Sequence, residues 1–440
     1  LTPADFGLIA ISSVLISFFA LFAEMGIGAA IIQFKRLTNE DLDTIFSFTF
    51  YIGSFLSLLF AFSSPFIATF YNNPQLLNLC IVLSLGIFLN CINIVPNALL
   101  LKEGKFKFLM YRQLIVQLVT GLIGVSAALM GLGVWALVIY TLSSNLLTVV
   151  INYIKHPLKL GRVHFEVLKK IAGYSVYQFL FNFINFFSRN LDTLLIGKYL
   201  SPVSLGFYDK SYRLMLLPIE NLTHVLSPVI QPIFSNFQDD KPKIYNAYLK
   251  IVKILALIGF PLSVFLHFTA KELIFLFFGS QWGESVPVFE ILALAVGFQV
   301  VLSSSGAVFQ AANDTKRLFL SGLLSAICLM SAICIGVFVL KSLVGIAYLL
   351  LAAFAINFFQ GYFVLVKITF KQSLIPFIKV LILPIFIACV IYCVEYLLQC
   401  FLKDDQLWFT FLTKSGVAFI IYLIMAGSSL YKIFREKRLN

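Results

Sequence analysis

The sequence predicts an all-α membrane protein that crosses the bilayer many times. Of its 440 residues, 60% are hydrophobic and 12% are charged, whereas a soluble domain carries about 25% charged residues. The mean hydropathy is +0.96. Apolar segments recur from end to end between short polar turns, and each approaches the roughly 20 residues that a helix needs to cross a bilayer.

About thirteen transmembrane helices are expected. Each is a long apolar run between turn residues, and Pro3 and Pro202 stand where the first turn of a helix tolerates proline. The predicted helices cover residues 5–33, 41–70, 75–101, 107–129, 133–154, 166–199, 203–235, 243–269, 284–312, 315–340, 344–368, 376–400 and 408–432.

Lysine and arginine residues concentrate on alternate connections between these helices. One set of connections holds 24 of the 32 cationic residues, and the positive-inside rule places that set in the cytoplasm. The C-terminus is then cytoplasmic and residue 1 lies outside. The net charge of +12 therefore reflects topology and does not indicate nucleic-acid binding. These cations lie at 35–36, 102–112, 155–170, 241–253, 316–317, 367–379 and 432–438.

An internal repeat divides the chain. The segment Leu1-Thr2-Pro3-Ala4-Asp5-Phe6-Gly7-Leu8 is echoed by Leu200-Ser201-Pro202-Val203-Ser204-Leu205-Gly206-Phe207, and residues 131–137 correspond to 341–347. Two parallel six-helix repeats are expected, and the first lacks its opening helix, so the chain is interpreted as an N-terminally shortened one. The predicted parts are an N-terminal lobe (1–155), a C-terminal lobe (156–370) and a C-terminal helix pair with a tail (371–440).

A polar stripe runs along the predicted helix 166–199. Its members recur at steps of three and four, so they share one face of the helix. Polar groups at membrane depth face protein or a water-filled cavity, which predicts a polar pathway for a solute. The stripe consists of Ser175, Gln178, Asn182, Asn185, Arg189 and Asp192.

The next helix carries a second polar row, and the first half contributes an acid. Arg213, Glu220, His224, Ser227 and Gln231 share a face of helix 203–235, and Glu24 ends the polar face of helix 5–33. We expect these groups to line a central cavity between the two lobes.

Two interpretations stay open for several of these residues. Arg189 and Asp192 either line the cavity or pair with each other to hold helices together. His224 is either a hydrogen-bonding residue in a packed helix or a proton carrier. Glu24 and Glu220 are costly to bury, which favours a functional role. Arg112 and the cations of 155–170 set topology or attract an anionic head group from the cytoplasm.

Several motifs resemble those of polysaccharide-exporter flippases of the multidrug/oligosaccharidyl-lipid/polysaccharide superfamily. They are LTPADFGLIAI at the start, GIGAAIIQ at 26–33, SRNLDTLLIGK at 188–198, YRLMLLP at 212–218 and the Phe278-Gly279-x-x-Trp282 turn. The resemblance covers nearly the whole chain. It is closest to the colanic-acid and exopolysaccharide exporters, a Wzx-like branch.

The resemblance implies a flippase for undecaprenyl-diphosphate-linked oligosaccharide repeat units in the bacterial inner membrane. From the two lobes we expect alternating access. We expect no cofactor other than a coupling ion, H⁺ or Na⁺, held by Glu24, Asp192 or Glu220. The expected partners are the lipid-linked oligosaccharide, membrane lipids, a polysaccharide polymerase and the chain-length machinery, and no nucleic acid. Arg189 suits the diphosphate because a guanidinium donates paired hydrogen bonds and stays charged.

Two other functions are considered. A multidrug or organic-cation antiporter of the same superfamily would favour acids without a cavity arginine, so the stripe argues against it. A membrane polysaccharide polymerase or ligase would need a longer outward loop with clustered catalytic groups. The predicted outward turns are short, and the sequence has no H-E-x-x-H and no G-x-S-x-G motif. We therefore expect no enzyme activity.

Overall fold

The computed structural model describes residues 1–34, 37–235, 240–401 and 406–436. Within these ranges every regular element is a helix, which confirms the all-α class. The chain divides into two compact units, Leu1–Gly206 (unit 1) and Phe207–Asn440 (unit 2). The boundaries predicted at 155/156 and 370/371 describe the repeats and remain a prediction.

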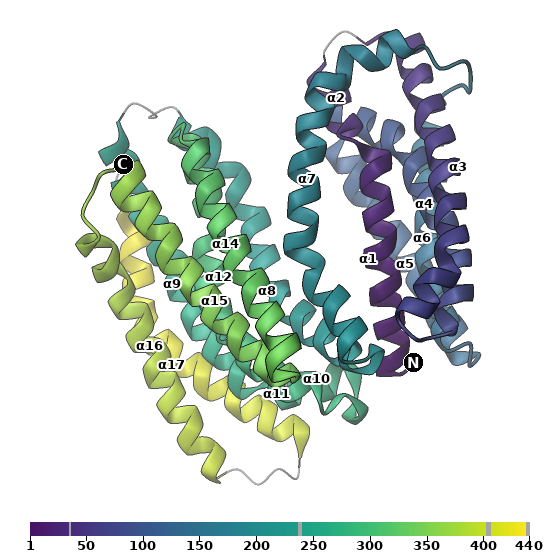
Figure 1. Cartoon of the computed structure of the whole chain (residues 1–440). Coiled ribbons are helices and arrows are strands. Elements are labelled where there is room, and N and C mark those ends of the chain that lie inside the picture. The colour runs from purple at the N-terminus through teal and green to yellow at the C-terminus, as the bar shows by residue number, and fades with distance from the viewer. Residues whose placement is uncertain (35–36, 236–239, 402–405, 437–440) are drawn as a thin grey trace. The chain divides into compact units, whose positions relative to one another are not determined.

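The described residues of unit 1 form a bundle of helices α1 to α7, followed by the start of α8 (Figure 1). The long helix α3 packs along α4, α4 packs on α6 and α1, and α6 packs on α5. Helix α7 lies against α1 and α2. The helices are α1 (Pro3–Glu24), α2 (Ile27–Gln33), α3 (Asn39–Phe70), α4 (Gln75–Lys102), α5 (Phe106–Leu129), α6 (Val134–Lys155) and α7 (Phe165–Tyr199).

Local sequence explains where the first helices of unit 1 begin. Thr2 and Thr38 are N-caps, and each forms a capping box with the aspartate three positions on, Asp5 and Asp41. Pro3 occupies the first turn of α1, where no backbone N–H is needed. These caps satisfy N–H groups that a helix end would otherwise leave without partners.

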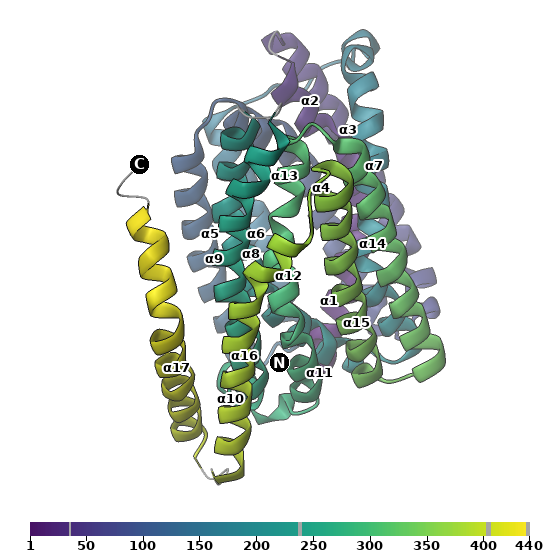
Figure 2. The same cartoon turned by 90° about the vertical axis from the view of Figure 1, so that its left-hand side faces the viewer.

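Unit 2 contains the rest of the chain. Helix α9 packs on α12 and α16, α15 packs on α11, α12 and α14, and α17 lies beside α16 and α9 (Figure 2). Its helices are α8 (Pro202–Ser235, which begins in unit 1), α9 (Lys241–Phe268), α10 (Ala270–Phe278), α11 (Ser285–Ala293), α12 (Ala295–Ser303), α13 (Ser305–Ala311), α14 (Thr315–Ile335), α15 (Leu343–Phe363), α16 (Ile375–Phe401) and α17 (Leu407–Glu436). A 3₁₀ turn at Ser280–Trp282 follows α10, and π-helical turns at Gly336–Leu340 and Val364–Thr369 extend α14 and α15.

Buried hydroxyl groups join three helices of unit 2. The Tyr248 hydroxyl lies 2.8 Å from the Ser304 Oγ and 2.9 Å from the Tyr362 hydroxyl, which donates to the Val301 carbonyl at 2.8 Å. The two tyrosine rings stack with an interplanar angle of 17°. Since each hydroxyl has a partner, these tyrosines can be buried without an unsatisfied polar group.

Two predicted helices are interrupted in the structure. Helix 5–33 breaks at Met25 and Gly26, whose positive φ angles of 38° and 72° end α1 and turn the chain into α2. Segment 284–312 forms three short helices, and the structure bends by 49° between Ser285–Ala293 and Ala295–Ala311. The apolar pattern continues through both breaks, so hydropathy alone did not reveal them.

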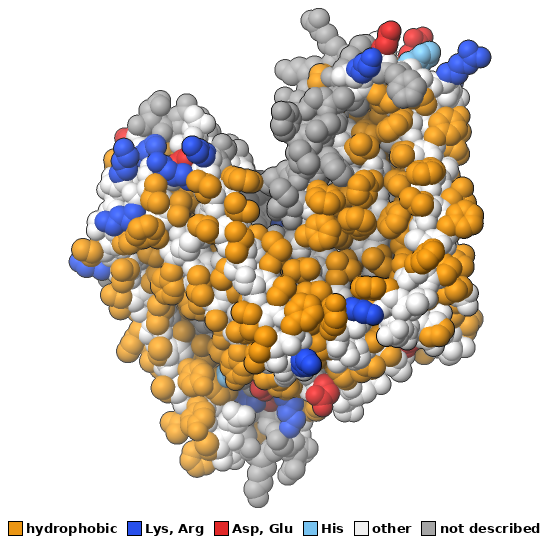
Figure 3. All heavy atoms as spheres, viewed as in Figure 1, with side chains coloured by type: hydrophobic (Ala, Val, Ile, Leu, Met, Phe, Trp, Pro, Cys, Tyr) orange, Lys and Arg blue, Asp and Glu red, His pale blue; other side chains and the backbone are white. Residues whose placement is uncertain are grey.

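Ten described helices are long and apolar enough to cross a membrane, and an eleventh span results if the bent segment is one crossing. Helices α7 and α8 lie outside this count, so the prediction of about thirteen spans is not confirmed as a number. Figure 3 shows apolar side chains over the middle of the helices, with lysine and arginine toward helix ends. On α5, Leu118 is 68% exposed and Leu122 is 70% exposed, as expected for side chains that face lipid.

The two repeat motifs contact each other through their glycines. A Cβ atom on Gly7 would lie 1.7 Å from the Pro202 carbonyl oxygen, and a Cβ atom on Gly206 would lie 2.0 Å from the Pro3 carbonyl oxygen. Each motif thus places its glycine against the proline of the other. The reciprocal contact supports the internal repeat and requires the absence of a side chain at both glycines.

We expect Gly7→Ala and Gly206→Ala to destabilise the protein by at least about 2 kcal/mol, because the clash is with backbone and no side chain can move aside. Thermal unfolding of the purified protein in detergent measures the effect. Gly121→Ala in α5 is the control, because its Cβ meets nothing within 4 Å and alanine favours the helix. A Gly7→Ala variant as stable as the control would contradict the assignment.

Candidate functional site

The helix with the predicted polar stripe is packed through its aromatic side. Helix α7 is a single helix over Phe165–Tyr199, and Phe183, Phe186 and Phe187 lie 5.5–6.3 Å, between ring centroids, from Phe18 of α1. Phe183 also contacts Phe22 at 6.3 Å. These phenylalanine rings therefore hold α7 against α1.

The two charged residues of the stripe have different surroundings. Arg189 is exposed, whereas Asp192 is 6% exposed and accepts a hydrogen bond of 2.7 Å from the Thr193 backbone N–H. An exposed guanidinium within a largely apolar bundle is available to a ligand. A buried aspartate one turn away is suited to holding the helix in place.

Glu24 stands at the point where α1 ends. It is exposed and directly precedes the turn at Met25 and Gly26. Its Oε1 would lie 3.8 Å from a Cβ atom on Gly28, so the first turn of α2 leaves room for the carboxylate. The helix break thus places an acid at a helix end instead of within a continuous span.

In unit 2, Arg213 is already partnered. Its Nε lies 2.9 Å from both carboxylate oxygens of Asp209, one turn earlier in α8. Arg213 itself is largely exposed, as is Glu220. The side chains of Gln178, Asn182, Asn185 and His224, also predicted for the site, lie outside the described residues. The site as a whole therefore stays a prediction.

A polar cluster in unit 1 was not predicted as a site. The Arg112 Nη1 donates to the Asn152 Oδ1 at 2.7 Å and to the Asn97 Oδ1 at 3.1 Å. The Asn152 Nδ2 donates in turn to the Asn93 Oδ1 at 2.7 Å. These four side chains join α4, α5 and α6, and neutral amides supply all the recorded partners of the guanidinium. The Arg112 Nε is buried without a partner among the described residues.

A carboxylate with two basic neighbours lies at the turn between α4 and α5. Lys105 forms an ion pair with Glu103, and the His156 Nε2 lies 3.3 Å from the same carboxylate. The hydrogen bond from Lys105, together with the charge of His156, holds the pKa of Glu103 below its usual range. Glu103 is exposed, and such surface pairs contribute little to stability.

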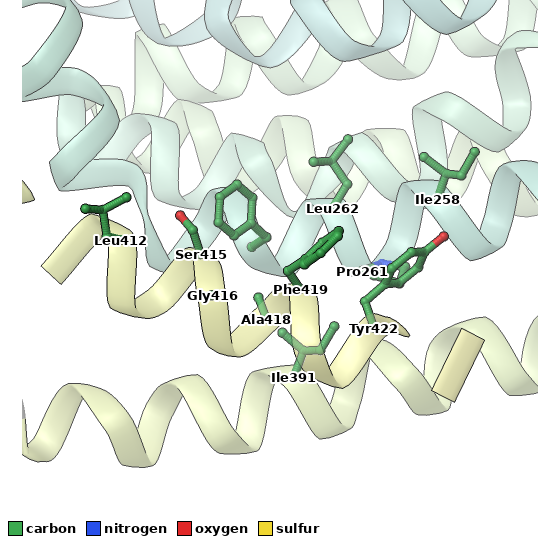
Figure 4. Close-up of a pocket in the computed structure, with 11 residues that line it drawn as sticks. Ile258, Pro261, Leu262, Ile391, Leu412, Ser415, Gly416, Ala418, Phe419 and Tyr422 are labelled. Atoms are coloured by element: carbon green, nitrogen blue, oxygen red, sulfur yellow. The ribbon is translucent and has the colours of Figure 1, made fainter. Parts of the chain in front are cut away.

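A groove with apolar walls lies in unit 2 between α9, α16 and α17 (Figure 4). Its volume is about 620 Å³. Figure 4 shows Ser415, Phe419 and Tyr422 of α17 on one side of the groove and Leu262 and Ile258 of α9 across from them. The lining residues are Ile258, Pro261, Leu262, Phe265, Ile391, Leu412, Ser415, Gly416, Ala418, Phe419 and Tyr422. Such a surface fits a hydrocarbon chain and offers almost no polar contact.

The described residues contain no group of three or more His, Cys, Asp or Glu side chains arranged to hold a metal ion. The polar groups described above are cations, amides and carboxylates. That set of groups can bind an anion or a proton through hydrogen bonds and charge.

The comparison with protein families decides the assignment. The family described as "Polysaccharide biosynthesis protein" matches residues 1–287. This chain belongs to that family. The match confirms, at family level, the resemblance to polysaccharide exporters.

A curated relative agrees with this membership. The family member described here is 24% identical over 415 residues to the lipopolysaccharide biosynthesis protein WzxC of Escherichia coli K12. The alignment covers 91% of this chain and 82% of WzxC.

Solved structures share the fold. The lipid II flippase MurJ, in an inward closed conformation, matches with a TM-score of 0.76 at 18% identity, over 98% of this chain and 93% of the other. An inward-facing multidrug-resistance MATE transporter of the MOP superfamily matches with a TM-score of 0.64 at 17% identity, over 85% and 93% of the chains. This polysaccharide-biosynthesis family member is therefore a multi-pass membrane protein with the fold of that superfamily.

We expect Arg112→Met to lower the stability by about 1–3 kcal/mol, because the amide oxygens of Asn97 and buried Asn152 lose their donor. Arg112→Lys should lose less stability, since an ammonium keeps the positive charge although it lacks the paired N–H donors of a guanidinium. Thermal unfolding of the purified variants measures both. Lys107→Met, an exposed cation five positions earlier in the same helix, is the control, and equal unfolding temperatures for Arg112→Met and Lys107→Met would refute the role.

Proposed function

We propose that this protein is a flippase that moves undecaprenyl-diphosphate-linked oligosaccharide repeat units across the bacterial inner membrane. The observation that carries the proposal is its membership of a polysaccharide-biosynthesis family on a fold shared with a lipid II flippase. A lipid-linked sugar needs a cation for its diphosphate, polar groups for its glycan and an apolar surface for its tail. The chain offers residues for each of these.

The diphosphate is assigned to Arg189. Its guanidinium is exposed on a helix whose other side is fixed to α1 by aromatic contacts, so the cation is carried by a rigid element. Arg213 and Arg112 are two further helical cations that we assign to the anionic head group. Gln178, Asn182 and Asn185 are assigned to sugar hydroxyls, and Glu24, Asp192, Glu220 and His224 to the polar lining or to ion coupling.

The polyprenyl tail is assigned to the groove between α9, α16 and α17. Its lining is apolar over almost its whole surface, and a hydrocarbon chain loses little when it leaves lipid for such a wall. The tail would thus stay in apolar surroundings while the polar head crosses.

The proposed cycle is alternating access, in which the two repeats (1–155 and 156–370) open the site first to the cytoplasm and then to the outside. H⁺ or Na⁺ resets the cycle. The C-terminus is proposed to be cytoplasmic, from the distribution of lysine and arginine.

A polysaccharide polymerase and the chain-length machinery are the proposed partners downstream. The alternative is an organic-cation antiporter. It would be favoured if deletion of the gene for this protein made the cells sensitive to organic cations and left their surface glycan unchanged.

We expect Arg189→Ala to reduce glycan export by on the order of tenfold or more, because a charge-assisted hydrogen bond contributes about 1.5–3 kcal/mol. The assay is surface glycan in a host whose own exporter gene is deleted. Lys379→Ala, which removes an exposed cation of α16, is the control. Wild-type export by Arg189→Ala, at equal protein level, would remove Arg189 from the mechanism.

We expect Gly416→Phe to fill the groove and reduce export while leaving the fold intact, since a Cβ atom at Gly416 meets nothing within 4 Å. Export and thermal stability are measured together. Gly322→Phe in α14 is the matched control, because that position is equally open and lies outside the groove. Equal export by the two variants would exclude the groove as the tail site.

A further inference from the structure

A buried ion pair joins the C-terminal helix pair to the rest of unit 2. Lys414 of α17 is 6% exposed, and its Nζ lies 2.5 Å from the Glu272 Oε1 at the start of α10. The same ammonium donates to the Phe268 carbonyl, the last residue of α9, at 2.8 Å. Glu272 is 2% exposed. The pair therefore fixes α17 against the junction of α9 and α10.

A second carboxyl group is buried beside this pair. Glu395 of α16 is 1% exposed, and neither of its oxygens has a hydrogen-bond partner among the described residues. The Oε2 of Glu272 also has none. Glu395 lies close enough to Lys414 and Glu272 to interact electrostatically with both. Three carboxylate oxygens are thus enclosed without donors around one ammonium.

The other titratable groups around the cluster come from α9, α10 and α11. The His267 Nδ1 of α9 lies 2.9 Å from the Glu290 backbone carbonyl, and its ring stacks on Tyr392. The Glu290 side chain is half-buried and interacts with His267, Lys414 and Glu272. Lys271, beside Glu272 in α10, is half-buried and has interactions of its own. None of these groups donates a recorded hydrogen bond to Glu395.

The charge balance of the buried cluster requires one more positive charge. Lys414 neutralises one carboxylate, and a second buried carboxylate without donors or counter-charge would cost several kcal/mol. A metal cation would need more oxygen ligands and would lie beside the ammonium, which repels it. A proton needs no further oxygen ligands, and as part of a neutral carboxylic acid it is not repelled by the ammonium. One proton shared between Glu272 and Glu395 neutralises the site, and the ion pair directs it to Glu395.

We infer that Glu395, Glu272 and Lys414 form a proton-binding site, and that its proton drives the conformational cycle. On binding, a proton from water joins a Glu395 carboxylate oxygen to give the neutral acid. On release, the proton returns to water, and Lys414 is shared between two carboxylates. Glu395 lies six residues before the end of α16 and Lys414 seven after the start of α17, near the turn predicted to face outside. The driving role rests on the proposed function, whereas proton binding does not.

The proton count can be measured without substrate. Infrared spectroscopy of the purified full chain records the carbonyl stretch of protonated carboxyl groups at neutral pH. We expect the wild type to show such a band, and Glu395→Gln to lose it. Glu272→Gln should also lose it, because Lys414 then has only Glu395 to neutralise. Lys414→Met should strengthen it, because two buried carboxyl groups then need a proton each.

Glu103→Gln is the control, since it removes an exposed acid outside the membrane spans and should leave the band unchanged. The three cluster variants are independent, so one that fails to fold leaves the other two to decide. A band that is the same in the wild type, Glu395→Gln and Glu272→Gln would overturn the proton site, as would a band that does not grow in Lys414→Met.

The pH dependence of stability gives a second measurement. A proton held in the folded state and lost from the unfolded state makes stability fall as the pH rises. Thermal unfolding of the wild type should therefore show this fall, and Glu395→Gln should show less of it. An identical pH profile for the two proteins would contradict the inference.

Export then tests the driving role. We expect Glu395→Gln to lose surface glycan at normal protein level in the exporter-deleted host, while Glu103→Gln keeps it. Full export by Glu395→Gln would overturn the driving role. If the wild-type chain itself exports no glycan while the infrared series holds, the proposed function fails and the proton site stands, so the two failures are distinguishable.

Discussion

The structure depends on one constraint: a polar group in apolar surroundings needs a partner inside the protein, because lipid supplies none. Tyr248, Ser304 and Tyr362 satisfy one another, and Arg112 is held by the amides of α4 and α6. Where this rule is met, the polar group fastens helices together. Where a charge remains exposed or lacks a partner, as at Arg189 and Glu395, the molecule keeps a group that is free to act on a ligand or a proton.

Close backbone contact is the other means of fastening. Gly7 and Gly206 each lie against the proline carbonyl of the opposite repeat motif, a contact that depends on small residues because apolar side chains gain nothing by leaving lipid for one another. The motif therefore has two roles: its proline starts a helix, and its glycine allows the starts of two helices to pack closely. This explains why the repeat is recognisable over so few residues.

The positions of most helices could be predicted from the sequence, because apolar length and turn residues are local signals. The breaks at Met25 and Leu294 could not, since the apolar pattern runs through them. The Arg112 cluster was missed because its partners stand 15 and 40 residues away, and a cation near a basic loop is equally explained by topology. The role of Glu395 was harder still to predict from the sequence, because Glu272 lies more than 120 residues earlier and only folding brings the two carboxyl groups together.

Each unit holds a polar cluster around a cation, and the two clusters differ in composition in a way that bears on mechanism. Unit 1 holds a guanidinium among neutral amides, whereas unit 2 holds two carboxyl groups around one ammonium. A site for an anionic head group needs excess positive charge while it is loaded, and in a low-dielectric medium that excess is costly once the head group has left. A carboxyl group that exchanges a proton changes the net charge of the protein by one. Placing it on the helices that also line the apolar groove would let protonation and tail occupancy act on the same part of the protein.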